Sequence, residues 1–227
     1  MVLSLSPGPA LLSEAELYKE IANMWRITDD FWDDWRLLYA MFEREEKWSI
    51  HAGAEHFPDA DMLPVGALRQ CENPENQTRF TSEEECTMMT LWCIARSPLF
   101  IGSELTKLPE KTLSLLTNPG LMDMHEKSRH AHQVLRRRIG ENEWIVWEAH
   151  RAGGGTYLAV FNADGPAHDF SIPLSELELP EKCDGKDIFT GEKVAFREPL
   201  SVHVPEHGAV CWQLEEDQFW IRIERDV

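Results

Sequence analysis

Long apolar runs and positive charge are both scarce in this sequence. No segment reaches the roughly 18 consecutive apolar residues of a membrane-spanning helix. Lys and Arg number 22 against 40 Asp and Glu, which leaves a formal net charge of −18 at pH 7. Because nucleic acids and anionic membranes are bound through clustered Lys and Arg, we expect neither as a partner. The opening residues, MVLSLSPGPALL, also lack the basic start of a signal peptide.

Cysteine and histidine patterns typical of metal sites are missing as well. The five cysteines are odd in number and lack CxxC spacing, so they predict neither a zinc site nor a complete disulfide framework. His125, His130 and His132 resemble zinc-ligand spacing only superficially. We therefore expect no metal and no cofactor. A reducing compartment is favoured, and with no signal peptide the cytoplasm is the expected location.

Short apolar segments alternate with helical patterns up to about residue 130. The pattern predicts parallel strands joined by helical crossovers. Thr81 and Glu84 form a capping box that opens one of the helices. The expected strands cover 1–6, 24–28, 59–66 and 99–102, and the expected helices cover 13–23, 31–48, 82–96 and 109–118. A (β/α)8 barrel takes about 250 residues. Residues 1–130 are therefore either a small open sheet or half of a barrel.

The pattern changes after residue 130. Alternating apolar and polar residues, separated by Gly, Pro, Asp and Asn, predict five strands in 143–151, 155–163, 168–174, 194–204 and 209–215. Regularly spaced short strands of this kind are typical of an antiparallel β-sandwich. Two domains are therefore expected, an α/β domain over 1–130 and an all-β domain over 131–227.

Acidic residues cluster in two places in the α/β part. The segment MWRITDDFWDDW, residues 24–35, places four Asp after a predicted strand and at a predicted helix start. Carboxylates are favoured at a helix start by the dipole alone, so chemistry and helix stabilisation are both open readings. In FPDADML, residues 57–63, Asp59 and Asp61 could bind a substrate or cap a turn. Two carboxylates are too few for a calcium site.

The order of these motifs resembles glycoside hydrolase family 27, the melibiase or α-galactosidase family. MWRITDDFWDDW is followed by FPDADML, LWCIARSPLFIGSEL, LLTNPGL and an all-β tail. The resemblance implies a (β/α)8 barrel followed by an antiparallel β-sandwich. It covers only the C-terminal half of the family, from about barrel strand five onward. The expected fold is thus the C-terminal half of a TIM barrel, strands five to eight, followed by the sandwich.

The resemblance also suggests a catalytic acid/base residue. The family places this aspartate four residues after an Arg and five before a Trp, a spacing that Arg26, Asp30 and Trp35 reproduce. Asp30 would then be the acid/base, and Arg26 would hold a sugar hydroxyl. Retaining hydrolysis uses such a carboxyl group about 5 to 5.5 Å from a nucleophilic carboxylate. Asp29 is expected to be a bystander, and Asp33 and Asp34 to be solvated helix residues.

Two further segments correspond to substrate-binding segments of the family. Asp61 would bind galactose hydroxyls, Met62 would line the pocket, and Asp59 would support them. Ser6 and Pro9 lie in the loop that contacts the substituent at sugar carbon two. Galactosidases generally have an acidic residue at the position of Ser6 and bulkier residues at those of Pro9 and Ala10, whereas α-N-acetylgalactosaminidases have smaller ones. A simple tight turn is the alternative reading of this loop.

One functional part of the family pattern has no counterpart in this sequence. The family nucleophile is an Asp in a Lys-x-Asp pattern after an aromatic-rich run, which this sequence does not contain. We therefore expect part of a retaining hydrolase of terminal α-galactosides, without its nucleophile-bearing N-terminal half and inactive by itself. Its partners would be an α-glycoside, small or oligosaccharide, and the missing barrel half or a second copy. The alternatives are α-N-acetylgalactosaminidase-like specificity, or a non-catalytic fragment that binds carbohydrate or a partner.

Overall fold

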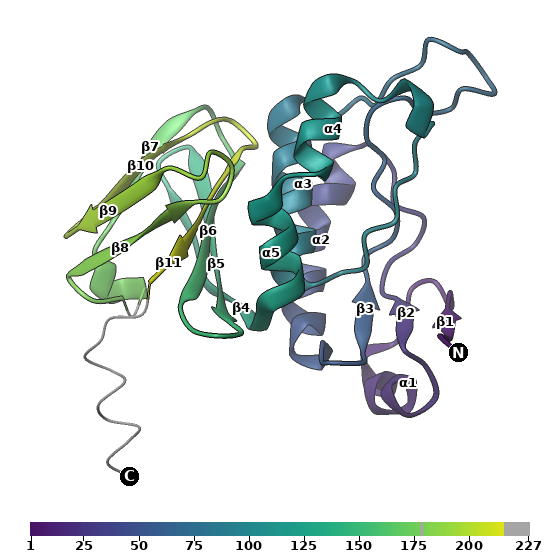
Figure 1. Cartoon of the computed structure of the whole chain (residues 1–227), viewed down its shortest axis with the longest axis horizontal. Helices are drawn as coiled ribbons and strands as arrows, with labels where there is room; N and C mark the ends of the chain where they lie inside the picture. Colours follow the sequence, from purple (N-terminus) through teal and green to yellow (C-terminus); the bar gives the residue numbers. More distant parts are fainter. Residues whose placement is uncertain (178, 216–227) are drawn as a thin grey trace.

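The protein consists of three layers (Figure 1). A computed structural model describes residues 1–177 and 179–215. A small parallel sheet lies on one side, a layer of helices lies in the middle, and an antiparallel β-sandwich covers the other side of the helices (Figure 1). Among the described residues, no helix is both long and apolar enough to cross a bilayer.

The parallel sheet contains β1 (Ser4–Leu5), β2 (Met24–Arg26) and β3 (Phe57–Asp59) in that order. Its third strand begins before the predicted range 59–66, and the predicted strand 99–102 is reduced to one parallel bridge between Leu63 and Ile101. The register pairs Arg26 with Asp59, so β2 and β3 end at the same edge. Whatever follows these two residues is therefore brought together at that edge.

The helical layer follows the predicted pattern with two differences. The α-helices are α1 (Ala15–Ile21), α2 (Trp35–Trp48), α3 (Ser82–Ala95), α4 (Glu110–Leu116) and α5 (Pro119–Lys127), and the 3-10 turns are η1 (Leu12–Glu14), η2 (Ser49–His51) and η3 (Leu105–Lys107). Helix α1 lies below the strands of the parallel sheet, outside the layer between that sheet and the sandwich (Figure 1). Helix α2 begins at Trp35, four residues later than predicted, so Phe31 to Asp34 form a loop. Helix α5 was not predicted. Asn118 caps it by accepting from the N–H groups of Gly120 and Leu121, and Pro119 fits its first turn.

The predicted capping box is present at the start of α3. Thr81 Oγ1 accepts from the Glu84 N–H at 3.2 Å, and Glu84 Oε2 accepts from the Thr81 N–H at 2.9 Å. Two N–H groups at the start of α3, which have no acceptor within the helix, are thereby hydrogen-bonded.

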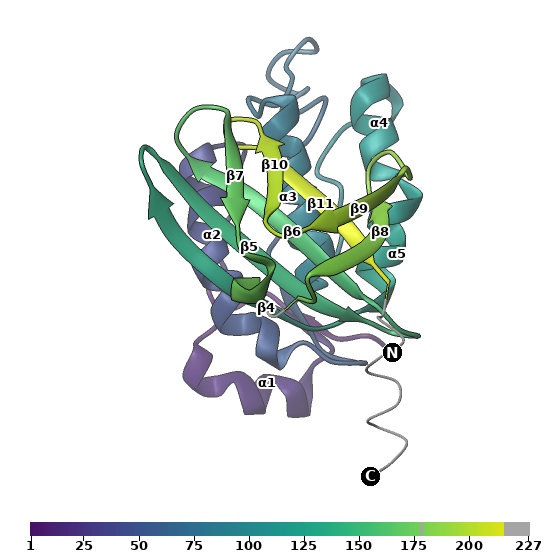
Figure 2. The same cartoon turned by 90° about the vertical axis from the view of Figure 1, so that its left-hand side faces the viewer.

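The sandwich combines a large and a small antiparallel sheet (Figure 2). The large sheet has the order β4 (Ser128–Ile139), β5 (Asn142–Arg151), β6 (Thr156–Asp164), β11 (Ala209–Leu214), β8 (Lys182–Asp187) and β9 (Lys193–Arg197). The small sheet pairs β10 (Leu200–Val204) with β7 (His168–Ile172), and a short turn, η4, covers Leu174–Leu177. Strands β4 and β8 were not predicted, and the predicted strand 194–204 is divided at Pro199 into β9 and β10.

The large sheet contributes to two cores because side chains alternate along its strands. On β6, Tyr157 and Phe161 belong to the core shared with the helices, whereas Leu158 and Val160 belong to the sandwich interior. The sandwich is therefore joined to the helical layer by a continuous apolar core.

Candidate functional site

Arg26, the last residue of β2, lies between two carboxylates. Its Nη1 is 3.0 Å from Asp30 Oδ1 and 3.8 Å from Asp61 Oδ2. The Asp30 side chain is 77% exposed, whereas those of Arg26 and Asp61 are mostly covered. Nε of Arg26 is buried and has no protein partner among the described residues. The guanidinium thus holds an accessible carboxylate at the carboxyl end of the sheet through Nη1.

Asp61 is held firmly from both its backbone and its side chain. Its Oδ2 accepts from the Phe31 N–H at 2.7 Å, and its own N–H donates to Asp59 Oδ1 at 2.9 Å. Trp92 Nε1–H donates to its carbonyl at 3.1 Å. The φ of 77° lies in the left-handed region, which Asp tolerates better than most residues. The loop after β2 and the loop after β3 are therefore joined at Asp61.

The loop after β1 reaches the same place. Gly8 has a φ of 33°, and a Cβ added there would lie 2.7 Å from Arg26 Nη2. The Ala10 N–H donates to the Arg26 carbonyl at 3.0 Å. Pro7 and Pro9 flank Gly8, Ser6 precedes Pro7, and the Gly8–Pro9 peptide is cis. The structure thus places the Ser6–Pro9 loop against Arg26. Met62 follows Asp61 and packs its sulfur on Gly102.

Two buried carboxylates lie behind this edge. Asp59 is almost fully buried, and burial raises its pKa, with the nearby Asp61 charge acting in the same direction against the hydrogen bond from the Asp61 N–H. Glu45, on α2, is 1% exposed, and its Oε1 has no protein partner among the described residues. Burial, with a smaller contribution from the Asp59 charge, raises the pKa of Glu45 to about 8. Glu45 is therefore protonated at neutral pH.

Asp33 corrects one sequence-based prediction. It was expected to be solvated, but it is 1% exposed. Arg69 donates to its two oxygens at 2.8 and 2.9 Å, and the Arg79 N–H donates to it at 2.7 Å. Burial alone would raise the pKa of Asp33, but these hydrogen bonds hold it below its usual value. Asp33 therefore fastens the loop between β2 and α2, residues 27–34, to residues 69–79. This loop is called the acidic loop below.

The remaining acidic residues of this loop have simpler surroundings. Asp34 caps α2 by accepting from the Arg36 N–H at 2.9 Å, and hydrogen bonds from Arg36 lower its pKa to about 2. Asp29 is exposed. Asp30 is thus the one of the four aspartates in residues 24–35 that is both accessible and paired with Arg26.

Sequence reasoning missed Glu45, Arg69 and Arg79. Glu45 follows Leu38, Met41 and Phe42 at helical spacing, so its position on the apolar face of α2 was a usable signal. The arginines lie 36 and 46 residues from Asp33, and no local pattern pairs them with it.

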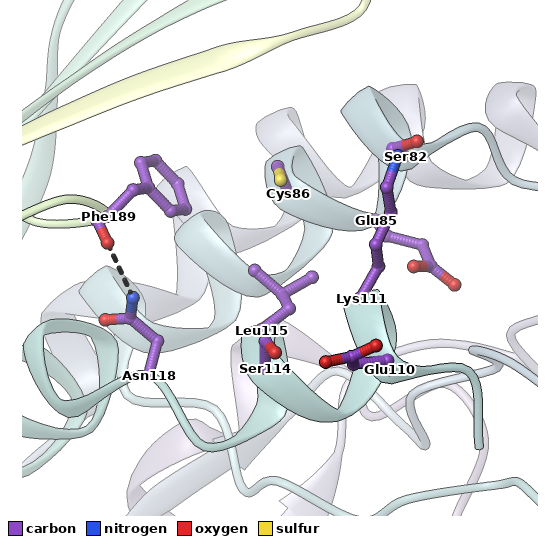
Figure 3. A pocket seen from close by; sticks show the side chains of 9 residues that line it. All are labelled: Ser82, Glu85, Cys86, Glu110, Lys111, Ser114, Leu115, Asn118 and Phe189. Carbon is purple, nitrogen blue, oxygen red and sulfur yellow. Dashed lines mark hydrogen bonds between the residues drawn. The ribbon is translucent and has the colours of Figure 1, made fainter.

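A separate cavity of about 490 Å³ lies between α3, α4 and the turn after β8 (Figure 3). Its walls include Glu85, Cys86, Leu115 and Phe189, and Asn118 Nδ2 donates to the Phe189 carbonyl at 3.0 Å. None of the expected site residues lines it. Burial raises the pKa of the Cys86 thiol to about 11, so this thiol is not an activated nucleophile. Glu85, whose pKa is raised by burial, also lines this cavity, but the residues expected at the site lie at the carboxyl end of the parallel sheet and not here.

No group of three metal-ligating side chains occurs among residues 1–177 and 179–215. The five cysteines are free. The chemistry that the edge can perform by itself is proton donation and acceptance by Asp30 and binding of hydroxyl groups by Arg26 and Asp61.

Comparison with known proteins gives two family matches. Residues 9–126 match the family described as alpha galactosidase A, and residues 141–214 match the alpha galactosidase C-terminal beta sandwich domain. Among curated proteins, alpha-galactosidase D of Emericella nidulans is 28% identical over 198 residues, which are 87% of this chain and 29% of that protein.

Solved structures match over nearly the whole chain. A family 27 β-L-arabinopyranosidase from Geobacillus stearothermophilus is 42% identical with a TM-score of 0.86, over 96% of this chain and 50% of that one. A candidate α-N-acetylgalactosaminidase from Bacillus halodurans C-125 is 36% identical with a TM-score of 0.71, over 85% of this chain and 45% of that one. The chain therefore spans half or less of the length of these relatives.

Proposed function

Because the chain belongs to glycoside hydrolase family 27, the melibiase family, we propose that it supplies the acid/base half of the active site of a retaining glycosidase. The observation that carries the proposal is the placement of Asp30. It is exposed, it lies beyond the end of β2, and it is paired with Arg26 at 3.0 Å. Active sites of (β/α)8 barrels lie at the carboxyl ends of the strands.

Each residue of the edge has a role in this proposal. Asp30 protonates the leaving oxygen and later removes a proton from the attacking water. Arg26 and Asp61 bind sugar hydroxyls through guanidinium N–H groups and carboxylate oxygens, and Asp59 holds Asp61 in place. Met62 lines the pocket beside them. The Ser6–Pro9 loop, packed on Arg26, forms the wall at sugar carbon two.

The nucleophile is proposed to come from a second set of βα units that closes the barrel. Both ends of the parallel sheet support this assembly, because apolar residues are exposed there. They are Val2 and Leu3 beside β1, Leu17 and Ile21 on α1, and Phe100, Ile101 and Leu113 at the opposite end. In a closed barrel such edges are paired and covered. These units can belong to the same polypeptide or to a separate one.

Terminal α-galactosides are the proposed substrates, and two related sugars are compared with them. β-L-Arabinopyranosides share the ring configuration of α-D-galactosides and lack the hydroxymethyl group, and the arabinopyranosidase is the more similar relative, at 42% identity. α-N-Acetylgalactosaminides would fit if Ser6, Pro9 and Ala10 leave room for an acetamido group. A site that must hydrogen-bond a hydroxyl discriminates strongly, whereas an open one tolerates added bulk.

Complementation tests the proposal. The chain would be co-expressed with the half of the Geobacillus enzyme that has no counterpart in it, and the three p-nitrophenyl glycosides would be compared by kcat/KM. We expect hydrolysis with retained configuration from the assembly and none from either half alone. Asp30→Ala should abolish hydrolysis of an alkyl glycoside, whose poor leaving group needs protonation, and should largely spare glycosylation by the p-nitrophenyl glycosides. Undiminished hydrolysis of the alkyl glycoside by Asp30→Ala would exclude the acid/base role. Sugar binding without hydrolysis by a correctly assembled complex would favour the alternative, a non-catalytic carbohydrate-binding fragment.

A further inference from the structure

The turn between β10 and β11 contacts the helical layer through His207. Its ring stacks on Trp35, with centroids 3.8 Å apart and planes 9° from parallel. Its Nδ1 lies 2.8 Å from Glu84 Oε1, and its carbonyl accepts from Thr87 Oγ1 at 2.6 Å. Since Glu84 also closes the capping box of α3, a single carboxylate ties the turn to that helix.

Trp35 connects this turn to the acidic loop. It is the first residue of α2 and follows Asp30 by five positions. The first turn of α2 is fastened to Asp34, whose carbonyl accepts from the N–H groups of Leu37 and Leu38. A displacement of Trp35 would therefore move the end of the loop that carries Asp30.

Other contacts of the sandwich lie on the same face of α2. Tyr39 Oη donates to Glu143 Oε2 at 2.6 Å, and the ring of Phe42 packs edge-on against Phe161 at 5.0 Å. Trp35, Tyr39 and Phe42 are spaced i, i+4 and i+7, so they form one row along the helix. The sandwich thus holds α2 along its length, and His207 holds the end nearest the acidic loop.

We propose that His207 is a positioning residue for Asp30, through Trp35. The loop is already held at Arg26 on one side and at Asp33 in its middle. The His207 stack adds a further restraint at Trp35, at the far end of the same loop beyond Asp33. The catalytic part of this inference rests on the proposed function of Asp30. In the assembled enzyme the β-sandwich would then contribute to the geometry of the active site.

Amide hydrogen exchange on the full chain tests the proposal without any hydrolysis. His207→Asn removes the stack, and Asn tolerates the positive φ of 53° at this position. His203→Asn is the matched control, because His203 lies in β10 and its side chain pairs with the exposed Asp169. From the strength of aromatic stacking, we expect the amides of Phe31 and Arg36 to exchange roughly three- to tenfold faster in His207→Asn. Amides of β5 and β6 should be unchanged.

A second variant separates the hydrogen bond from the stack. Glu84→Gln keeps an acceptor for the capping box and leaves the ring of His207 on Trp35. We expect a smaller acceleration at the same amides. Unchanged exchange at Phe31 and Arg36 in His207→Asn, or equal acceleration throughout the chain, would overturn the proposal, because His207 would then act on nothing local or on global stability alone.

The complemented enzyme adds a catalytic readout. Misplacing the acid should slow alkyl glycosides, which need protonation of a poor leaving group, more than p-nitrophenyl glycosides. We therefore expect His207→Asn to lower kcat/KM for the alkyl substrate several-fold more than for the aryl substrate. The reason is that a displaced Asp30 carboxyl group is less well placed to protonate the leaving oxygen. An unchanged ratio together with faster exchange would restrict His207 to loop stability and overturn the catalytic part. Undiminished hydrolysis of the alkyl glycoside by Asp30→Ala would instead count against the proposed function, whatever the exchange result.

Discussion

Glu45 offers a sharp test of the buried layer behind the acidic edge. Its side chain is enclosed between α2 and the parallel sheet, its Oε1 has no protein partner among the described residues, and the Asp59 charge lies close enough to raise its pKa further. Glu45→Gln keeps the shape of the side chain and removes its charge. The variant therefore reports how strongly the folded protein resists ionisation at this position.

The expected magnitude follows from proton linkage. The pKa of Glu45 is about 8 in the folded protein, against 4.5 for a solvent-exposed Glu side chain. The folded state therefore holds the proton over a range in which the unfolded state has lost it. The favourable contribution of Glu45 is fully present below pH 4.5 and is lost as the pH rises through 8. Between pH 4.5 and 7 the loss amounts to about 3 kcal/mol of unfolding free energy.

Thermal unfolding across pH measures this loss. For a chain of this size, about 3 kcal/mol corresponds to roughly 6 to 12 °C in Tm. The Tm of Glu45→Gln should therefore rise above that of the wild type by this amount from pH 4.5 to 7. Glu46→Gln is the control, because it removes a carboxylate from the exposed side of the same turn. Parallel profiles for the wild type and Glu45→Gln would refute the reasoning, since they would mean that the folded protein accommodates the Glu45 charge.

Three further substitutions test the catalytic assignment and two structural contacts. In the complemented enzyme, Asp30→Asn should slow hydrolysis of glycosides with poor leaving groups by about 10²- to 10⁴-fold and largely spare glycosylation by activated aryl glycosides. Equal losses from Asp29→Asn in steady-state assays would contradict the assignment of Asp30. Asp33→Asn should lower the unfolding free energy by about 2 to 3 kcal/mol in urea titrations, because two arginines lose a buried charged partner. A change as small as that caused by Asp29→Asn would contradict the structural role of Asp33. Thr81→Ala should lower it by about 1 kcal/mol and Ser82→Ala by much less, and similar effects would show that the capping box contributes little.

The parts of the fold that were predicted correctly depend on local patterns. The family and the fold class, half of a barrel followed by a sandwich, are confirmed. The capping box at Thr81 opens α3 as predicted, because it needs only residues three apart. Helix α5 was missed because Pro119 and Gly120 were interpreted as a helix end, whereas Asn118 makes them the start of a new helix. Strand β8, with the sequence KCDGKD, has no apolar alternation that could have predicted it.

In the site too, contacts between residues close in sequence could be predicted, whereas contacts between distant residues could not. The four-residue spacing of Arg26 and Asp30 is visible in the sequence because both residues belong to one strand and the loop after it. The burial of Asp33 was not predictable, because its partners come from a loop that lies 36 to 46 residues away. The role proposed for His207 depends on a contact across 172 positions with Trp35, counted from their numbers, and only the docking of the sandwich creates it.

Parallel pairing explains how half of a barrel can keep one wall of an active site. The register places Arg26 opposite Asp59, so the residues beyond both strand ends meet without help from other strands. The Phe31 N–H then finds Asp61, and Arg26 lies between Asp30 and Asp61. A glycosidic bond in a retaining enzyme must also face a second carboxylate about 5 to 5.5 Å from the first. Of the other carboxylates near Asp30, Asp61 accepts from Phe31 and Asp59 accepts from Asp61, while the exposed Asp29 is a bystander in the family pattern. Under the proposed function, the nucleophile is therefore expected on the opposite wall of a closed barrel.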